Sequence, residues 1–200
     1  PMGCLLPTNS LDDFIEQVSL ASSPTHKSDV AISGAVVIAW AVSKAIEGHT
    51  WGAIKDQLPA IALAAQTKNI TTTFSASMAS RVELALMVAS EDSGIEDRME
   101  KIYNLVGAGV STIESVPAAI AMVELAETDP NRCAILCANL GGDTDTIGAM
   151  ATAICGALNG IQAIDTKLKQ QLDDENQLDF DEYARKFLSL REVKEQGYAS

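Results

Sequence analysis

Aromatic residues and positive charge are scarce in this sequence. Phe, Trp and Tyr make up 4% of the 200 residues, and 14 Lys and Arg stand against 27 Asp and Glu, which gives a net charge of −13. Nucleic-acid backbones are bound mainly by Lys and Arg, so this balance argues against a nucleic-acid partner held on a general basic surface. It still allows a small anionic ligand held by helix N-termini and a metal ion.

The spacing of a disulfide framework is also absent, and so is a clear membrane-spanning run. The four cysteines, Cys4, Cys133, Cys137 and Cys155, do not follow the pattern of a small disulfide-stapled protein. Cys133 and Cys137 are one helical turn apart among apolar residues, which predicts buried thiols and a reducing, cytoplasmic location. The apolar run at residues 30–43 is shorter than the roughly 20 residues that a bilayer-spanning helix needs, so we expect no membrane partner.

Nearly every segment shows the spacing of apolar residues that is typical of an α-helix. Leu11, Phe14, Ile15 and Val18 lie at i, i+3, i+4 and i+7, after a plausible N-cap at residue 9 or 10. Further helices are predicted at residues 30–46, 51–65 (interrupted near Pro59), 77–90, 95–106, 115–127, 130–138 and 145–159, with a loop at 68–77 and helical spacing again at 180–190. We find no convincing strand or linker, so the sequence predicts one all-α domain over residues 1–200.

The most informative stretch is residues 141–148, Gly-Gly-Asp-Thr-Asp-Thr-Ile-Gly. It places two carboxylates and two hydroxyls in four consecutive residues, after a glycine pair and at the start of a predicted helix. Mg²⁺ and Mn²⁺ prefer carboxylate, hydroxyl and water oxygens. In a first helical turn Asp143 and Thr146 share a face, and Asp145 lies about 100° round the axis. The pattern fits a metal site formed by these three residues, and it also fits ordinary helix capping by an acidic first turn.

Two other acidic motifs match less well. An EF-hand loop that starts at Asp143 would need oxygen ligands at residues 147 and 154, where the sequence has Ile147 and Ile154. A phosphatase of the haloacid dehalogenase type would need Thr in place of Ile147 and a buried parallel strand before the motif, and neither is present. The sequence therefore argues against both.

Residues 139–160, NLGGDTDTIGAMATAICGALNG, resemble the C-terminal signature of the ADP-ribosylglycohydrolase family. Three weaker matches follow the family's order. Residues 1–3 resemble the end of its M-R-x-x-P-x-G segment, Thr25 and His26 resemble its T-H motif, and residues 114–119 resemble its E-x-x-P-A-A segment. The resemblance extends from residue 1 to about residue 163.

This resemblance implies a compact orthogonal helical bundle and a hydrolase of ribosyl, ADP-ribose-type glycosidic bonds that uses two Mg²⁺ or Mn²⁺ ions. By resemblance, Asp143, Asp145 and Thr146 would be metal ligands. The family takes its other ligands from an early Glu and a Thr-Asp-Asp motif, whereas both Asp-Asp pairs of this chain follow Leu. We therefore expect the C-terminal portion of one domain, which supplies half of the site. The general acid or base would lie in a missing N-terminal part or a companion chain, and the isolated chain would be nearly inactive.

The resemblance also suggests residues that bind the small-molecule or protein-linked substrate. His26 would contact the pyrophosphate or the distal ribose, and its alternative role is to cap or support the following helix. Gly107, Gly109 and Ser111 lie where the family places a loop against the nucleoside. Many members have an aromatic residue there, but residues 110–112 are Val, Ser and Thr, which leaves room for a smaller N-ribosyl substrate.

Two other roles stay open from the sequence. The family includes lens crystallins, so a catalytically inactive relative that binds a nucleotide or serves a structural role is the main alternative. A helical interaction module that uses its acidic surface is a third possibility, and it predicts no response to Mg²⁺.

Overall fold

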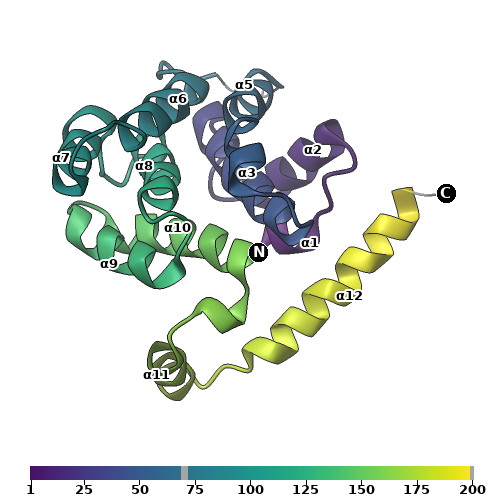
Figure 1. The fold of residues 1–200 in the computed structure, drawn as a ribbon. Coiled ribbons are helices and arrows are strands. Elements are labelled where there is room, and N and C mark those ends of the chain that lie inside the picture. Colours follow the sequence, from purple (N-terminus) through teal and green to yellow (C-terminus); the bar gives the residue numbers. More distant parts are fainter. Residues whose placement is uncertain (69–71, 199–200) are drawn as a thin grey trace.

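The computed structural model describes residues 1–68 and 72–198, with side chains up to residue 195. Within these ranges every regular element is a helix, which confirms the all-α prediction (Figure 1). The predicted loop at 68–77 is present over residues 72–77, and residues 69–71 lie outside the described part.

Helix α3 (Asp29–Ile46) is the centre of the fold, and it packs against α1 (Met2–Leu5), α2 (Leu11–Ser22), α5 (Leu58–Lys68) and α10 (Thr144–Asn159). Its small residues allow close packing. The Ser33 hydroxyl donates to Ala62 O at 2.8 Å, and a Cβ added at Gly34 would overlap the Thr112 methyl group. By length and composition α3 could cross a membrane, but 72% of it is buried inside the fold, as in the core helix of a globular domain.

Most predicted helices are confirmed, with shifted ends. The break near Pro59 falls between α4 (Trp51–Lys55) and α5, and Pro59 occupies the first turn of α5, where its missing N–H costs little. Ser10 caps α2 as expected, because its side chain accepts from Asp13 N. The remaining elements of the body are α6 (Met78–Ala89), α7 (Ile95–Lys101), the π-helical turn η1 (Ile102–Val106), α8 (Thr112–Leu125) and α9 (Pro130–Leu140).

Helices α9 and α10 pack together through cysteines. Cys133, Cys137 and Cys155 are buried free thiols, which confirms that part of the prediction, and the Cys133 and Cys137 sulfurs are 4.0 Å apart. Hydrogen bonding to Cys137 and Cys155, together with burial, raises the pKa of the Cys133 thiol. These residues therefore act as small apolar side chains in the core.

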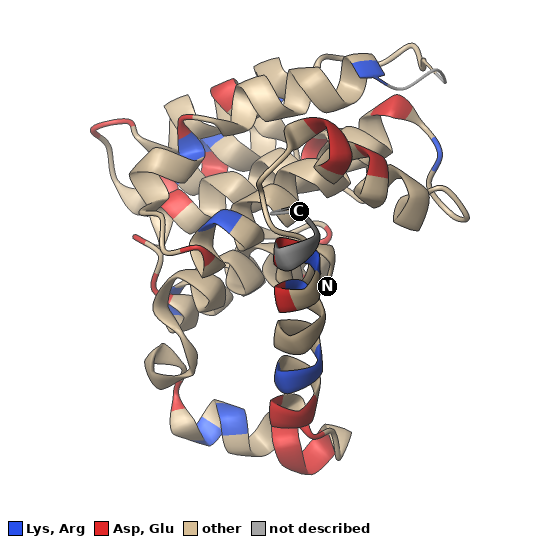
Figure 2. Ribbon diagram, turned by 90° about the vertical axis from the view of Figure 1, so that its right-hand side faces the viewer, with Lys and Arg blue, Asp and Glu red and all other residues tan. Residues whose placement is uncertain are grey.

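The C-terminal region leaves the body as an arm in both ribbon views (Figure 1 and Figure 2). The short 3₁₀ turn η2 (Ile161–Ala163) and helix α11 (Thr166–Asn176) lead to α12 (Phe180–Tyr198), which returns past α1 (Figure 1). Arg191 fastens α12, since its guanidinium is 4% exposed and donates to Gly3 O at 3.1 Å and Leu6 O at 2.9 Å. It also donates to Ser43 Oγ at 3.1 Å and forms an ion pair with Glu47 at 2.8 Å.

Candidate metal and substrate site

The start of α10 presents the carboxylates of the acidic motif. Asp143 is the N-cap residue, yet its side chain accepts no hydrogen bond from the backbone of the first turn. Its Oδ1 atom instead accepts from the Thr146 hydroxyl at 3.0 Å, which confirms that these two residues share a face. Asp145 and Thr146 are exposed, and Asp143 is half-buried. Helix capping therefore does not explain the Asp143 carboxylate.

The glycine pair before α10 lets the acidic motif pack against a second loop, residues 107–111. Gly141 has φ of +88° and Gly142 has φ of +72°, in the region that favours glycine. A Cβ added at Gly142 would overlap the carbonyl oxygen of Ala108. The next amide, Asp143 N, donates to the same oxygen at 2.7 Å. The backbones of the two segments are therefore in direct contact.

That second loop is the predicted substrate loop, and the Glu114 side chain of α8 contacts its backbone. Glu114 Oε2 accepts from Gly109 N at 2.9 Å. A Cβ added at Gly107 or Gly109 would lie 2.6 or 2.8 Å from the same oxygen, so both glycines are needed for this approach. Glu114 is the first residue of the segment that resembles the family's E-x-x-P-A-A, and no role was predicted for it. Two glycines followed by a carboxylate at the start of a helix could have indicated that Glu114 binds the loop backbone.

The outer side of this loop faces solvent. Val110 is 85% exposed. Ser111 is the N-cap residue of α8, but its hydroxyl makes no capping hydrogen bond. The structure therefore brings Gly107, Gly109 and Ser111 to the same end of the fold as Asp143, on a loop whose hydroxyl and backbone are open to a ligand.

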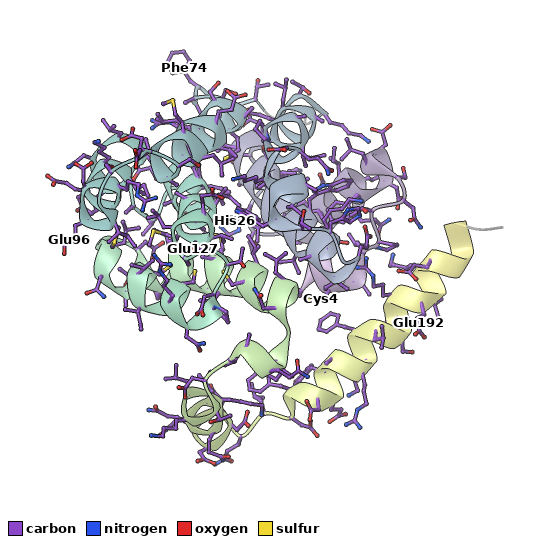
Figure 3. All side chains as sticks on the ribbon, in the orientation of Figure 1. Cys4, His26, Phe74, Glu96, Glu127 and Glu192 are labelled. Carbon is purple, nitrogen blue, oxygen red and sulfur yellow. The ribbon has the colours of Figure 1, made fainter. Side chains whose placement is uncertain are left out.

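His26 is not joined to these groups by a hydrogen bond or ion pair among the described residues. It is exposed in the turn between α2 and α3, and its Nδ1 atom lies 2.9 Å from the Thr25 hydroxyl. Figure 3 labels it between α3 and α8 in that view. Ser28, which accepts from Ala31 N at 3.2 Å, caps α3, so the capping alternative for His26 is wrong.

A further carboxylate, Asp29, lies at the start of α3, and it was not singled out in the sequence. It is 4% exposed and accepts from Thr73 N at 3.1 Å and from the Thr73 hydroxyl at 2.6 Å. Burial alone would raise its pKa, but these hydrogen bonds and one from the Val30 backbone outweigh burial, and the pKa lies below its usual value. Asp29 therefore holds the loop at residues 72–77 onto α3.

The number of metal-ligating side chains is small. Over residues 1–68 and 72–195 no group of three or more His, Cys, Asp and Glu side chains lies close enough to hold a metal ion. The start of α10 offers two carboxylates and one hydroxyl, which is a hard-oxygen donor set but an incomplete one for six-coordinate Mg²⁺.

Comparison with known proteins extends the resemblance along almost the whole chain. The family model described as ADP-ribosylglycohydrolase matches residues 1–197. The uncharacterized protein YegU of Escherichia coli (strain K12) is 64% identical over 195 residues, which cover 98% of this chain and 58% of that protein. ADP-ribosylhydrolase ARH3 of Homo sapiens is 28% identical over 193 residues, which cover 88% of this chain and 53% of that protein. ADP-ribosylhydrolase ARH3 of Bos taurus is 27% identical over 195 residues, covering 88% and 53%.

The match differs in extent from the resemblance seen in the motifs. It continues beyond residue 163 and includes α11 and most of α12. The chain spans about half the length of the curated relatives it matches. Since the family model covers nearly all of its residues, this chain belongs to the ADP-ribosylglycohydrolase family.

Proposed function

We propose that the chain is part of an enzyme that hydrolyses ADP-ribosyl-type glycosidic bonds, with Asp143, Asp145 and Thr146 as ligands of Mg²⁺ or Mn²⁺. The observation that carries the proposal is the Asp143 carboxylate. It stands at the start of α10 without capping the helix and is oriented by the Thr146 hydroxyl. The family, and the activity that the name of the ARH3 relatives states for them, support the reaction class.

The donor set fits a hard divalent cation. Two divalent ions would carry four positive charges, and Asp143 and Asp145 supply two negative ones. Mg²⁺ takes about six oxygen ligands and usually keeps several waters. The remaining ligands would come from water, from the substrate and from a protein segment outside this chain. When bound, such ions supply Lewis-acid polarisation and orientation of the ribose hydroxyls.

The chain's own residues would position the substrate beside that site. Glu114 holds the Gly107 to Ser111 loop in place from one side, and the opposite, solvent-facing side with the Ser111 hydroxyl would contact the substrate. His26, in the turn between α2 and α3, would bind an anionic or hydroxyl group of the substrate. Cleavage at the anomeric carbon passes through an oxocarbenium-like state, whose positive charge nearby carboxylates stabilise. The general acid or base would lie outside these residues.

The test compares single alanine variants in a protein of the relatives' full length. Asp143→Ala and Asp145→Ala are expected to abolish saturable Mn²⁺ binding in calorimetry and to slow ADP-ribose release by roughly 10²-fold or more. Asp56→Ala is the control, because Asp56 is exposed at the end of α4. Full Mn²⁺-dependent activity in either site variant would refute the ligand assignment. Mn²⁺ binding without hydrolysis of any ADP-ribosylated substrate would favour a non-catalytic relative.

A further inference from the structure

A groove of about 670 Å³ lies between α7 with its π-helical turn and α9, and it ends at the glycine pair before α10. Its floor is apolar. The floor residues are Ile95, Met99, Tyr103, Leu136 and Leu140. The groove is separate from the charged residues proposed above as metal ligands or substrate contacts, because none of them lines it.

The charged residues of the groove are two carboxylates of one sign. Glu96 and Glu100 are both exposed, and among the described residues neither has an ion-pair partner. Figure 3 shows Glu96 at the outer edge of α7. The cations of α7 are engaged elsewhere, since Lys101 pairs with Glu91 at 2.8 Å and Arg98 donates to Ala89 O at 2.8 Å. In the part of the chain that the structure describes, no Lys or Arg lines the groove.

The spacing of the two carboxylates selects an extended cationic chain. Glu96 and Glu100 are one helical turn apart, which is about 6 Å along the axis. In an extended polypeptide, side chains at i and i+2 lie on one face about 6.5–7 Å apart. Two Lys or Arg residues separated by one residue therefore match the pair. Their aliphatic stems would cover apolar floor while their charged ends meet the carboxylates.

The groove is continuous with the start of α10. The Tyr103 ring lies against Gly141, where an added Cβ would be 3.2 Å from Tyr103 Cε2. Gly141 is followed directly by Gly142 and the Asp143 carboxylate. A polypeptide in the groove would therefore bring its neighbouring residue to the candidate site.

We propose that this groove binds the polypeptide of a protein-linked substrate, and that it favours two basic residues at i and i+2 next to the modified residue. The inference deepens the proposed function and rests on it for the identity of the modification. Charge complementarity, the apolar floor and continuity with the acidic motif favour a cationic polypeptide over a neutral or acidic one.

The first experiment measures binding alone and needs no catalysis. A short fluorescein-labelled peptide with Arg-Leu-Arg in a Gly and Ser background is titrated with the chain at low salt, and anisotropy gives Kd. Glu96→Gln and Glu100→Gln are each expected to weaken binding roughly two- to fivefold, since exposed ion pairs contribute little individually. Glu192→Gln is the control, because Glu192 is exposed on α12, away from the groove (Figure 3). The same loss in the control, or no loss in either groove variant, would overturn the inference.

Comparison peptides separate this groove from general acidity. A peptide with adjacent Arg residues should bind more weakly, and one with Gln in place of Arg should not bind. Equal binding of the adjacent-Arg peptide, or equal competition by free spermine, would show a diffuse response to positive charge and would overturn the proposal.

The second experiment distinguishes this proposal from the proposed function. In a protein of the relatives' full length, ADP-ribose release is compared between an ADP-ribosylated Arg-Leu-Arg peptide and a small ADP-ribosyl compound. The groove variants should raise KM for the peptide two- to fivefold and leave the small compound unchanged. If neither substrate is hydrolysed although the peptide still binds, the proposed function fails and the groove stands as a peptide site. If both are hydrolysed and the variants change neither KM, the groove proposal fails alone.

Discussion

Gly142 is the residue on which the geometry of the acidic motif depends most directly. Its φ of +72° is unfavourable for any residue with a Cβ. A Cβ added there would also overlap the Ala108 carbonyl oxygen that accepts from Asp143 N at 2.7 Å. Gly142→Ala must therefore strain the backbone and separate the motif from the substrate loop.

The size of the effect follows from these two contributions. An L-residue in the left-handed region costs about 1–2 kcal/mol. Loss of the Asp143 hydrogen bond adds about 0.5–1.5 kcal/mol. We expect Gly142→Ala to lower the free energy of unfolding by about 1.5–3.5 kcal/mol, or Tm by roughly 3–14 °C for a chain of this length.

A matched Gly→Ala substitution within the following helix, α10, should change stability in the opposite direction. Gly156 is in the interior of α10, and a Cβ there would meet no atom within 4 Å. Gly156→Ala should therefore raise stability by about 0.5–1 kcal/mol, because alanine loses less backbone entropy than glycine in a helix. Both variants differ from the parent by one methyl group, so the comparison isolates the local geometry.

The assay is urea unfolding followed by circular dichroism, with Mn²⁺ calorimetry on the same samples. Gly142→Ala should lose stability and bind Mn²⁺ more weakly, while Gly156→Ala should gain stability and bind as before. Equal stability of Gly142→Ala and the parent would refute the described contact with Ala108. A stability loss with unchanged Mn²⁺ binding would show that the start of α10 does not depend on that contact.

Three further substitutions test other parts of the fold. Arg191→Met should increase hydrogen exchange in residues 180–195 with little change in the Tm of the body. Arg185→Met changes an exposed residue on the same helix and should leave hydrogen exchange in that segment unchanged. The folded pKa of Asp29 lies below the ordinary 3.8, so its stabilisation is complete above that pH and is lost as pH falls through the lower folded value. Asp29→Asn should therefore be less stable at neutral pH and lose less stability than the parent in acid-unfolding curves below about pH 4. Trp51→Phe removes the indole donor to Glu124, a 2.6 Å bond, and should cost about 1 kcal/mol in urea unfolding.

The sequence predicted the body of the fold well, because apolar spacing is local information. The buried helix at residues 30–46 and the cap at Ser10 are examples. Helices α1 and α11 were not predicted. The first has only four residues, too few to show a period, and the acidic and polar residues of the second resembled a solvated segment. Helix α8 begins at Thr112 rather than residue 115, and the backbone amides of Glu114 and Ser115 both donate to Ser111 O in its first turn.

The candidate site divides in the same way. The acidic motif was evident because all its ligating groups occur within four residues. That Ala108 accepts from Asp143, and that Glu114 supports the loop, depends on which helices meet in space, and no local pattern encodes it. Asp29 looked like an ordinary acidic residue in a first turn. Its partner Thr73 is 44 residues away, so its burial could not be read from its neighbours.

Arg191 shows why the C-terminal arm was the least predictable part. An Arg on a helix rich in charge normally faces water, so the sequence around Arg191 gave no reason to expect burial. The partners that explain its burial lie at the N-terminal end of the chain. Helix α1 is too short to satisfy its own last carbonyls, and the guanidinium supplies donors to Gly3 O and Leu6 O. Because these contacts involve α1 and the end of α3 rather than α10, release of α12 should leave the acidic motif in place, so the arm and the candidate site can be perturbed independently.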